Sequence, residues 1–246
     1  MNNKKEETKN KEENIDEKEN RIPVIGEKAP SFKAKTTQGK ISFPDDFEGN
    51  WVILFSHPAD FTPVCSSEFM TFASMEKKFE ELNTKLVGLS VDGIHSHIAW
   101  LRTIKEKLVH NGIEGADVKF PLIEDISMDV AKKYGMIQPE ESKTEAVRAV
   151  FFIDPDGIIR TLLYYPLSLG RSFDELYRIL IGLQTADEFG VATPADWQPG
   201  DDVIVPPAGT SEEAEERMND DSITCDDWFF CKKNISKKEI EKKIKN

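Results

Sequence analysis

The chain has 246 residues, of which 39% are hydrophobic and 31% are charged, a length that fits one large domain or one domain with appendages. Its 32 Lys and Arg stand against 45 Asp and Glu, giving a formal net charge of −13. Such an acidic chain repels phosphate backbones, which argues against a general nucleic-acid binder. No apolar run approaches the roughly 18 residues that a membrane span needs.

The first 21 residues are almost wholly Lys, Glu, Asn and Asp, with Ile15 the only aliphatic side chain after Met1. A signal peptide needs an apolar segment, and a mitochondrial presequence is poor in acids. We therefore expect residues 1–21 to be a disordered charged tail. We also expect a cytoplasmic protein whose thiols are reduced at rest.

Ordered structure is expected to begin near Ile22, with a turn at residues 36–40 between two short extended pieces. The continuous apolar run 51–55 predicts a buried strand. After a short loop, Thr62 as N-cap and Pro63 at the first helical position predict a helix. Its apolar face has the spacing of a helix and comprises Phe69, Phe72, Ala73, Met75, Phe79 and Leu82.

Strands and helices continue to alternate along the chain. The expected segments are a strand at 85–91, a helix at 94–108, an extended piece at 120–123, a helix at 128–134 capped by Ser127, a hairpin of 147–154 with 158–165, and a helix capped by Ser172. This order predicts an α/β fold with a mixed central sheet flanked by helices.

The amino-acid composition of the sequence changes after Ala186. Residues 193–209 are rich in Pro, Gly and Asp and are expected to be irregular, residues 211–221 are acidic, and residues 232–246 are strongly basic. We expect this section to lack a core of its own and to wrap on its domain or on a neighbouring subunit. The predicted organisation is a tail at 1–21, a domain at 22–186 and a C-terminal arm at 187–246.

Cys65 follows a predicted strand and loop and lies at the start of a predicted helix. Helix N-termini present unpaired N–H groups and partial positive charge, which favour the thiolate form of a cysteine. The local pattern therefore predicts a reactive thiol. The alternative is a buried, inert cysteine, which is common in proteins.

The segment from Phe55 to Glu68 resembles the peroxidatic-cysteine segment of peroxiredoxins. The family pattern Pro-x-x-x-Thr/Ser-x-x-Cys is met by Pro58, Thr62 and Cys65. A His before the Pro and the run Phe-Thr-Pro-Val-Cys are typical of the 1-Cys-type branch. The resemblance spans Ile22 to Lys233 and continues in Asp92, His97, Trp100, residues 148–155, residues 170–175 and residues 194–200.

This resemblance implies a thioredoxin-like fold with a C-terminal extension at a dimer interface. It also implies a thiol peroxidase for hydrogen peroxide and organic hydroperoxides, without a cofactor. Cys65 would attack the peroxide and become a sulfenic acid. Arg148 would hold the thiolate and bind the peroxide oxygens, Thr62 would offer its hydroxyl, and Pro58 would shield the site.

Each of these roles has a plainer alternative. Thr62 could serve only as a helix cap, Arg148 as a surface base and Pro58 as a loop residue. His57, which the family places near the thiol, is equally compatible with a structural histidine. The resemblance implies that Arg171 positions Arg148 through an acid such as Glu68, although Arg171 could simply pair with a helix carboxylate.

Cys225 and Cys231 form a C-x5-C pair. A zinc site is disfavoured because the spacing is wrong and the four histidines are distant, so we expect no metal. The inferred compartment disfavours a structural disulfide. The pair resembles the C-terminal cysteines of archaeal and some bacterial members, which implies that Cys231 resolves Cys65 of the partner subunit. Cys225 would then exchange with Cys231 and pass the disulfide to a reductant, while the aromatics Trp228, Phe229 and Phe230 bury the arm.

The family further implies a homodimer, assembling to a decamer as a pentamer of dimers, and a thioredoxin-like reductant. Two alternatives stay open: a redox-switched oligomeric chaperone or signalling protein, and a strict one-cysteine peroxidase. Some animal members also carry a lipase-like Ser and His. Asn50 and Pro44 stand at those positions here, so phospholipase activity is not predicted.

Overall fold

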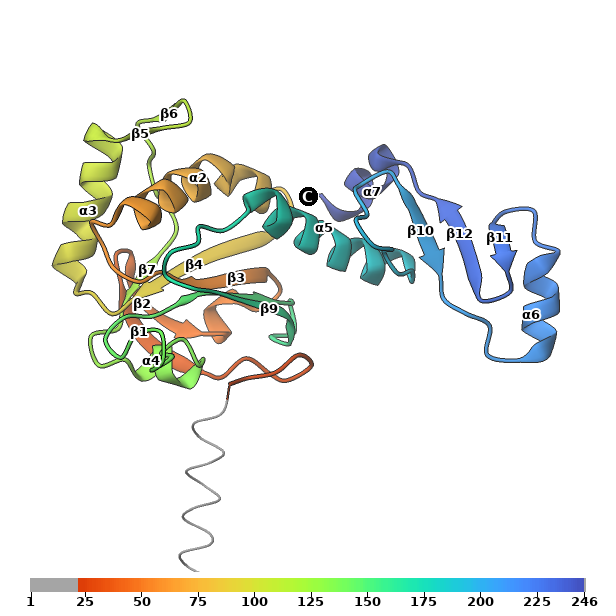
Figure 1. The fold of residues 1–246 in the computed structure, drawn as a ribbon, viewed down its shortest axis with the longest axis horizontal. Coiled ribbons are helices and arrows are strands. Elements are labelled where there is room, and N and C mark those ends of the chain that lie inside the picture. Colours follow the sequence, from red (N-terminus) through yellow and green to blue (C-terminus); the bar gives the residue numbers. More distant parts are fainter. Residues whose placement is uncertain (1–21, 246) are drawn as a thin grey trace, which may run out of the picture. The chain divides into compact units, whose positions relative to one another are not determined.

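The structure is a computed structural model that describes residues 22–245, so the predicted tail at 1–21 lies outside the described residues. Contacts divide the chain into two compact units (Figure 1). The first comprises the described residues up to Glu80 together with Thr84–Arg171. The second comprises Glu81–Asn83 together with the residues from Ser172 onward.

The first unit is built on a seven-stranded mixed sheet with the order β2-β1-β7-β4-β3-β8-β9. The β3–β4 and β4–β7 pairs are parallel, and the other neighbours are antiparallel. The mixed sheet predicted from the sequence is therefore confirmed. The strands are β1 (Phe32–Thr36), β2 (Gly39–Phe43), β3 (Trp51–Ser56), β4 (Thr84–Ser90), β7 (Leu122–Glu124), β8 (Arg148–Ile153) and β9 (Ile159–Tyr165).

Helices cover this sheet, and its central strand β3 is buried along its whole length. Val52 and Leu54 belong to the cluster on one side, while Phe55 stacks on Phe72 of α2 with ring centroids 4.0 Å apart. This arrangement explains why the strand is a continuous apolar run. The remaining elements of the unit are η1 (Asp45–Phe47), α2 (Pro63–Glu80), α3 (Ile94–Lys107), β5 (Val109–His110), β6 (Ile113–Glu114) and α4 (Asp129–Lys133).

The start of α4 differs from the prediction. The carboxylate of Asp125 accepts hydrogen bonds from the N–H groups of Val130 and Ala131, at 3.2 and 2.7 Å. The Ser127 hydroxyl donates instead to Asp129. Asp125 thus satisfies the free N–H groups of the helix start, because its charged side chain is buried against them. The predicted Ser172 cap is confirmed, since its hydroxyl accepts from the Glu175 N–H at the start of the following helix.

The second unit has a buried core in which residues of the C-terminal section pack on Ile181 of the preceding helix. Ile181, Val191, Trp197, Val203, Ile235 and Ile240 form a buried cluster. The stretch expected to be irregular also contains a strand, which belongs to a three-stranded sheet of order β10-β12-β11. The elements are α5 (Phe173–Phe189), β10 (Asp202–Val205), α6 (Ser211–Met218), β11 (Thr224–Asp227), β12 (Phe230–Asn234) and α7 (Lys237–Ile244).

None of the helices within residues 22–245 combines the length and the apolar character needed to cross a membrane.

Candidate active site

Cys65 lies in the first turn of α2, directly after β3 and the loop that follows it. Its thiol is free and its side chain is 0% exposed. The loop is anchored by two backbone hydrogen bonds, from His57 N–H to the Leu89 carbonyl and from Asp60 N–H to the Asp92 carboxylate. The predicted strand–loop–helix setting of this cysteine is therefore present in the structure.

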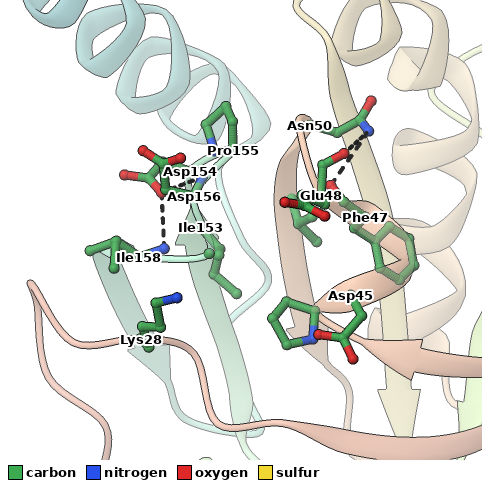
Figure 2. A pocket seen from close by; sticks show the side chains of 13 residues that line it. Lys28, Asp45, Phe47, Glu48, Asn50, Ile153, Asp154, Pro155, Asp156 and Ile158 are labelled. Carbon is green, nitrogen blue, oxygen red and sulfur yellow. Dashed lines mark hydrogen bonds between the residues drawn. The ribbon is translucent and has the colours of Figure 1, made fainter.

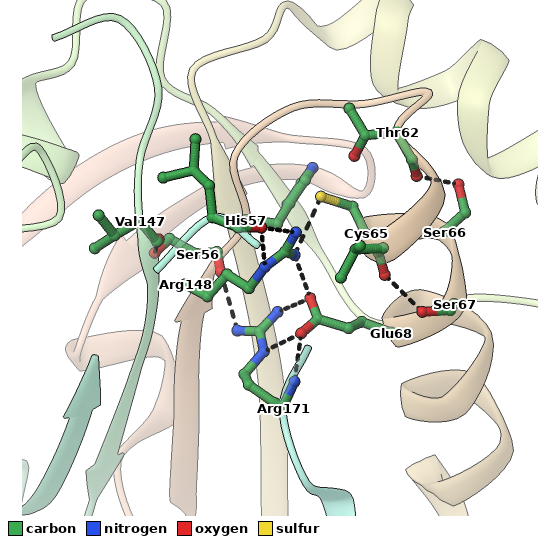
Figure 3. A network of polar contacts seen from close by, with 12 residues as sticks. Ser56, His57, Thr62, Cys65, Ser66, Ser67, Glu68, Val147, Arg148 and Arg171 are labelled. Carbon is green, nitrogen blue, oxygen red and sulfur yellow. Dashed lines mark hydrogen bonds and ion pairs between the residues drawn. The ribbon is translucent and has the colours of Figure 1, made fainter. Parts of the chain in front are cut away.

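Arg148 places its guanidinium against the thiol (Figure 3). Nη1 donates to Cys65 Sγ at 3.3 Å and to Glu68 Oε2 at 2.8 Å. Nε and Nη2 donate to the Leu167 carbonyl at 3.1 and 2.8 Å. Arg148 is 2% exposed, so it is a buried group at the start of β8 and not a surface base.

Arg171 holds the same carboxylate from its other side (Figure 3). Its Nε and Nη2 donate to the two oxygens of Glu68 at 3.0 and 2.6 Å, and its backbone N–H adds a third bond at 2.9 Å. Its Nη1 donates to the Ser56 and Ala149 carbonyls. The guanidinium also lies over the rings of Phe55 and Phe72.

The buried network carries an excess positive charge. Burial alone would raise the pKa of Glu68, but Arg171 and Arg148 outweigh it and hold the pKa below its ordinary value. Two guanidiniums against one ionised carboxylate leave one net positive charge next to Cys65. Because buried charges are stable only when paired, a Cys65 thiolate would complete the balance.

His57 is the first residue of a buried chain of polar contacts. Its Nε2 lies 3.0 Å from Asp60 Oδ1, and His97 Nδ1 lies 2.8 Å from Asp60 Oδ2. His97 Nε2 reaches the Ile123 carbonyl at 3.1 Å. The ring of His57 stacks on Trp100 at 5.0 Å, and its Nδ1 has no hydrogen-bond partner among the described residues. One ring nitrogen of His57, Nε2, is therefore hydrogen-bonded to Asp60, while the other, Nδ1, has no hydrogen-bond partner among the described residues.

Burial and mutual hydrogen bonds shift the pKa values of His57 and Asp60. It lowers the pKa of His57 below 6.5, although the hydrogen bond and charge of Asp60 act in the opposite direction. For Asp60 burial raises the pKa, but the hydrogen bonds to His57 and His97 outweigh it and lower the value to about 2. The favoured state near neutral pH is a charged Asp60 beside an uncharged His57.

The remaining predicted residues of the site have fewer contacts. Pro58 is buried in the loop before α2. Thr62 is half-buried, and its hydroxyl donates to the Ala59 carbonyl at 2.9 Å. Pro58 and Thr62 thus lie on the same short loop as His57, just before the helical turn that holds Cys65.

One group of side chains has the spacing of a cation site. His57, Asp60 and Asp92 each offer one ligand atom, all within 4.8 Å of one another. Hydrogen bonds account for these contacts: Asp60 bonds to both histidines, and Asp92 accepts from Ser90 Oγ and from the Asp60 N–H. The group therefore holds the loop together, and we assign it no metal.

Cys225 and Cys231 face each other across β11 and β12 and form a disulfide. The inferred reducing compartment argues against a structural disulfide, yet the structure joins this pair. Cys231 is 0% exposed, whereas Cys225 is half-buried. The three aromatics between them are 39–54% exposed in the single chain.

A hollow of about 480 Å³ lies between the start of β3 and the β8–β9 turn (Figure 2). Pro44 and Asn50 line it together with Asp154. The Asn50 amide donates to the Phe47 and Glu48 carbonyls, so it stabilises the turn before β3. The lining of this hollow contains neither a hydroxyl side chain nor an imidazole.

Two contacts of the site were not predicted from the sequence. The Leu167 carbonyl fixes Arg148, and a backbone acceptor leaves no signal in a sequence. Asp60 joins two histidines, and its spacing of three residues from His57 is a weak local signal for that contact.

A buried free thiol at a helix start, bonded to a buried arginine of a mixed α/β sheet, is the arrangement of a candidate reactive cysteine in an α/β protein. Comparison with known proteins identifies the family to which this chain belongs. The AhpC/TSA family matches residues 25–162, and the C-terminal domain of 1-Cys peroxiredoxin matches residues 182–220. A peroxiredoxin of Methanosarcina mazei is 58% identical over 219 residues, covering 88% of this chain and 100% of the relative. A peroxiredoxin of Aquifex aeolicus is 51% identical over 224 residues, covering 87% and 98%.

Solved structures agree with these relatives. A yeast mitochondrial 1-Cys peroxiredoxin superposes with a TM-score of 0.76 at 38% identity, covering 87% of this chain and 100% of its own. A cysteine-to-serine mutant of Peroxiredoxin 6 from Arenicola marina gives a TM-score of 0.75 at 36% identity, covering 86% and 98%. The chain belongs to the peroxiredoxin family. It has the family's thioredoxin-like fold and is a thiol peroxidase, an oxidoreductase.

The pKa of His57 predicts how stability depends on pH. Because the folded state favours the neutral ring, the unfolded chain binds more protons below pH 6.5. The free energy of unfolding should therefore fall as the pH drops below that value, by up to about 1.4 kcal/mol per pH unit for this group. Asp60, with a pKa of about 2 in the folded state, is charged in both the folded and the unfolded chain between about pH 5 and 7, so it adds no slope in that window.

Urea unfolding at several pH values in this window measures the slope. The His57→Phe variant keeps an aromatic ring against Trp100 and removes the titrating group. Its slope should be shallower than that of the parent by about one proton. An identical slope in the two proteins would contradict the assignment of the neutral ring.

Proposed function

We propose that Cys65 is the peroxidatic thiol and that Arg148 activates it. The contact that carries this proposal is the 3.3 Å bond from Arg148 Nη1 to Cys65 Sγ in a site with excess positive charge. The thiolate attacks the terminal oxygen of hydrogen peroxide or an organic hydroperoxide. An S–O bond forms as the O–O bond breaks, sulfur becomes a sulfenic acid, and the leaving oxygen takes a proton to give water or an alcohol.

The first turn of α2 supplies further groups for this step. The N–H groups of Val64 and Cys65 belong to the four that an α-helix leaves without internal partners, and they would stabilise charge on the departing oxygen. The Thr62 hydroxyl donates to the Ala59 carbonyl, so its oxygen still has lone pairs that can accept from the peroxide. Pro58, buried in the same loop, would limit access of water.

Three residues would support the reacting groups without bonding to the sulfur. Glu68 fixes the guanidinium of Arg148, and Arg171 fixes Glu68. His57 would add a free nitrogen in the buried wall of the site. This arrangement favours the positioning role of Arg171 over a simple pairing on a helix surface, because Arg171 is 6% exposed and bonded at every guanidinium nitrogen.

Substitution of the thiol tests this assignment. Cys65→Ser should abolish peroxide consumption while the circular dichroism spectrum is retained. Arg148→Lys keeps the charge but loses the planar fork, and its rate constant for peroxide consumption should fall about 100-fold. The matched control is Arg102→Lys, whose side chain is 74% exposed and should not change the rate. Full activity in Cys65→Ser would overturn the proposal.

We further propose that Cys231 resolves the sulfenic acid on Cys65 of the partner subunit. The two sulfurs join and water leaves. Cys225 then attacks Cys231, which releases Cys65 as a thiolate and leaves the Cys225–Cys231 disulfide, the pair that is bonded in the structure. A thioredoxin-like dithiol would reduce this bond by attack on Cys225, because Cys225 is half-buried and Cys231 is 0% exposed.

A homodimer follows from the need for a partner subunit. Strand β9 is the last strand in the order of the large sheet, and its residues after Ile159 are half-buried. Such an edge can pair with the same edge of a second copy. The exposed aromatics of the β11–β12 turn would be covered in the same assembly. A decamer and a cytoplasmic location belong to this proposal and rest on the family resemblance.

Non-reducing gels after one equivalent of peroxide test the resolving step. The Cys225→Ser variant should accumulate a dimer linked through Cys65 and Cys231. The Cys231→Ser variant should form no such dimer and should retain a sulfenic acid that reacts with dimedone. If Cys231→Ser turns over with a thioredoxin-type reductant as fast as the parent, the chain is a strict one-cysteine peroxidase and the proposal fails.

A further inference from the structure

The segment around the Cys225–Cys231 disulfide is strongly acidic. Between Thr210 and Lys233 the chain carries eight Asp and Glu against three Lys and Arg, a formal net charge of −5. Four of the acids lie on α6, a helix without a buried residue. The last turn of α6 contacts the disulfide, since the Arg217 carbonyl oxygen lies 3.9 Å from Cys225 Sγ. Figure 1 shows α6 beside β11, the strand that contains Cys225.

The polar atoms in contact with the two sulfurs add to this negative character. Besides the Arg217 carbonyl at Cys225, Cys231 Sγ lies 3.5 Å from the Asp227 carbonyl oxygen and 3.7 Å from that of Trp228. Carbonyl oxygens carry partial negative charge, and those in the last turn of a helix form its negative end. An anion that approaches this disulfide is therefore repelled both by the atoms in contact with it and by the surrounding carboxylates.

Two of the three bases in this segment are already engaged. Lys232 Nζ lies 3.4 Å from a carboxylate oxygen of Asp226, and the guanidinium of Arg217 donates to the Pro206 carbonyl. The charges of Lys232 and Asp226 cancel within their pair. The remaining negative charge is carried by the exposed carboxylates of α6 and of the turn that follows it.

A hollow of about 430 Å³ in the same surface is lined by residues of α6 and β12. Three carboxylates line it, those of Glu213, Glu216 and Asp220, together with the bases Arg217 and Lys233. Acids thus outnumber bases around the hollow, so a Lys or Arg side chain of a partner would meet complementary charge there. Complementary charge of this kind speeds the encounter of two proteins and suppresses wrong partners.

We propose that this acidic surface selects the thiol reductant of the Cys225–Cys231 disulfide by its charge. The surface favours a dithiol protein with a basic surface around its attacking cysteine, and it disfavours anionic small thiols such as glutathione. This inference rests on the proposed function in taking a thiol as the reductant of this disulfide, and it adds the chemistry by which that thiol is recognised.

Charge matters because the attacking group in this reaction is an anion. A thiolate of the reductant attacks Cys225 Sγ, a new S–S bond forms, and the Cys225–Cys231 bond breaks, so that Cys231 leaves as a thiolate and takes a proton. A second thiolate of the reductant then attacks the reductant's own sulfur in the mixed disulfide. This step releases Cys225, which takes a proton, and leaves the reductant as a disulfide. The acidic surface slows the first attack unless positive charge on the same molecule offsets the repulsion.

The test measures reduction of the Cys225–Cys231 disulfide in the full chain with Cys65→Ser, isolated with this disulfide closed. The probes are cysteamine, mercaptoethanol and glutathione, whose thiolates are in this order neutral overall, singly negative and doubly negative. Samples are quenched with acid, the new protein thiols are alkylated, and loss of the disulfide is followed by mass spectrometry at low ionic strength. Each thiol is compared with itself between two proteins, so its intrinsic reactivity cancels.

The charge variant combines Glu215→Gln, Glu216→Gln and Asp221→Asn. These three carboxylates are exposed and make no hydrogen bond or ion pair among the described residues, so the fold should be kept. Relative to the parent, the second-order rate constant should be unchanged with cysteamine, and it should rise about 3-fold with mercaptoethanol and about 10-fold with glutathione. The rise grows with the negative charge of the thiolate, because each unit of charge experiences the same change in potential. In about 1 M salt the differences should vanish.

A matched control separates the charge around the disulfide from the net charge of the chain. It combines Glu114→Gln, Glu140→Gln and Asp156→Asn, which remove the same charge from exposed positions of the first unit. The rate constants of this control should match those of the parent with all three thiols.

Three results would overturn the proposal. One is an unchanged rate constant with glutathione in the charge variant. Another is an equal acceleration with all three thiols, which would indicate that the substitutions loosen the segment around the disulfide. The third is the same thiol-dependent acceleration in the control, which would assign the effect to the net charge of the chain. Failure of Cys231 to resolve Cys65 would bear only on the proposed function, because these measurements use a chain without Cys65.

Discussion

Two buried guanidiniums share one carboxylate in this protein, and this sharing fixes the position of the Arg148 guanidinium beside the Cys65 thiol. Glu68 accepts from Arg171 through both oxygens and from Arg148 through one, and Arg148 uses the same Nη1 to reach Cys65 Sγ. Both arginines and Glu68 are at most 6% exposed. Buried charges of this kind are costly unless paired, so the guanidinium of Arg148 has few alternative positions.

The fold brings these groups together from distant parts of the chain. Cys65 and Glu68 are one turn apart on α2, Arg148 begins β8, and Arg171 follows β9. The antiparallel pairing of β3 with β8 places the end of β3 beside the start of β8. Ser56 at the end of β3 bonds to the Val147 carbonyl and accepts from the Ala149 N–H. The sheet therefore fixes the position of Arg148 relative to Cys65, and the helix start adds its free N–H groups beside the thiol.

Local signals in the sequence predicted most of the first unit. The apolar run of β3, the Pro63 helix start and the hairpin of β8 and β9 are each encoded within a few residues, so periodicity and caps were sufficient. Long-range contacts were not predictable in this way. Asp125 replaces Ser127 at the start of α4, and the bond between Ser66 and Trp100 spans 34 residues. The core of the second unit was missed because its apolar residues are scattered without a period.

The most direct test of the shared carboxylate is the rate of Cys65 oxidation by hydrogen peroxide in Glu68→Gln, followed by stopped-flow fluorescence. The amide keeps the shape of the side chain but removes the charge that Arg148 and Arg171 share. Without the negative charge of Glu68, the guanidinium of Arg148 should no longer be held at Cys65 Sγ. The second-order rate constant for Cys65 oxidation by hydrogen peroxide should therefore fall at least about tenfold. Glu106→Gln, an exposed partner of Arg102, should leave it unchanged. A parental rate constant in Glu68→Gln would contradict the account.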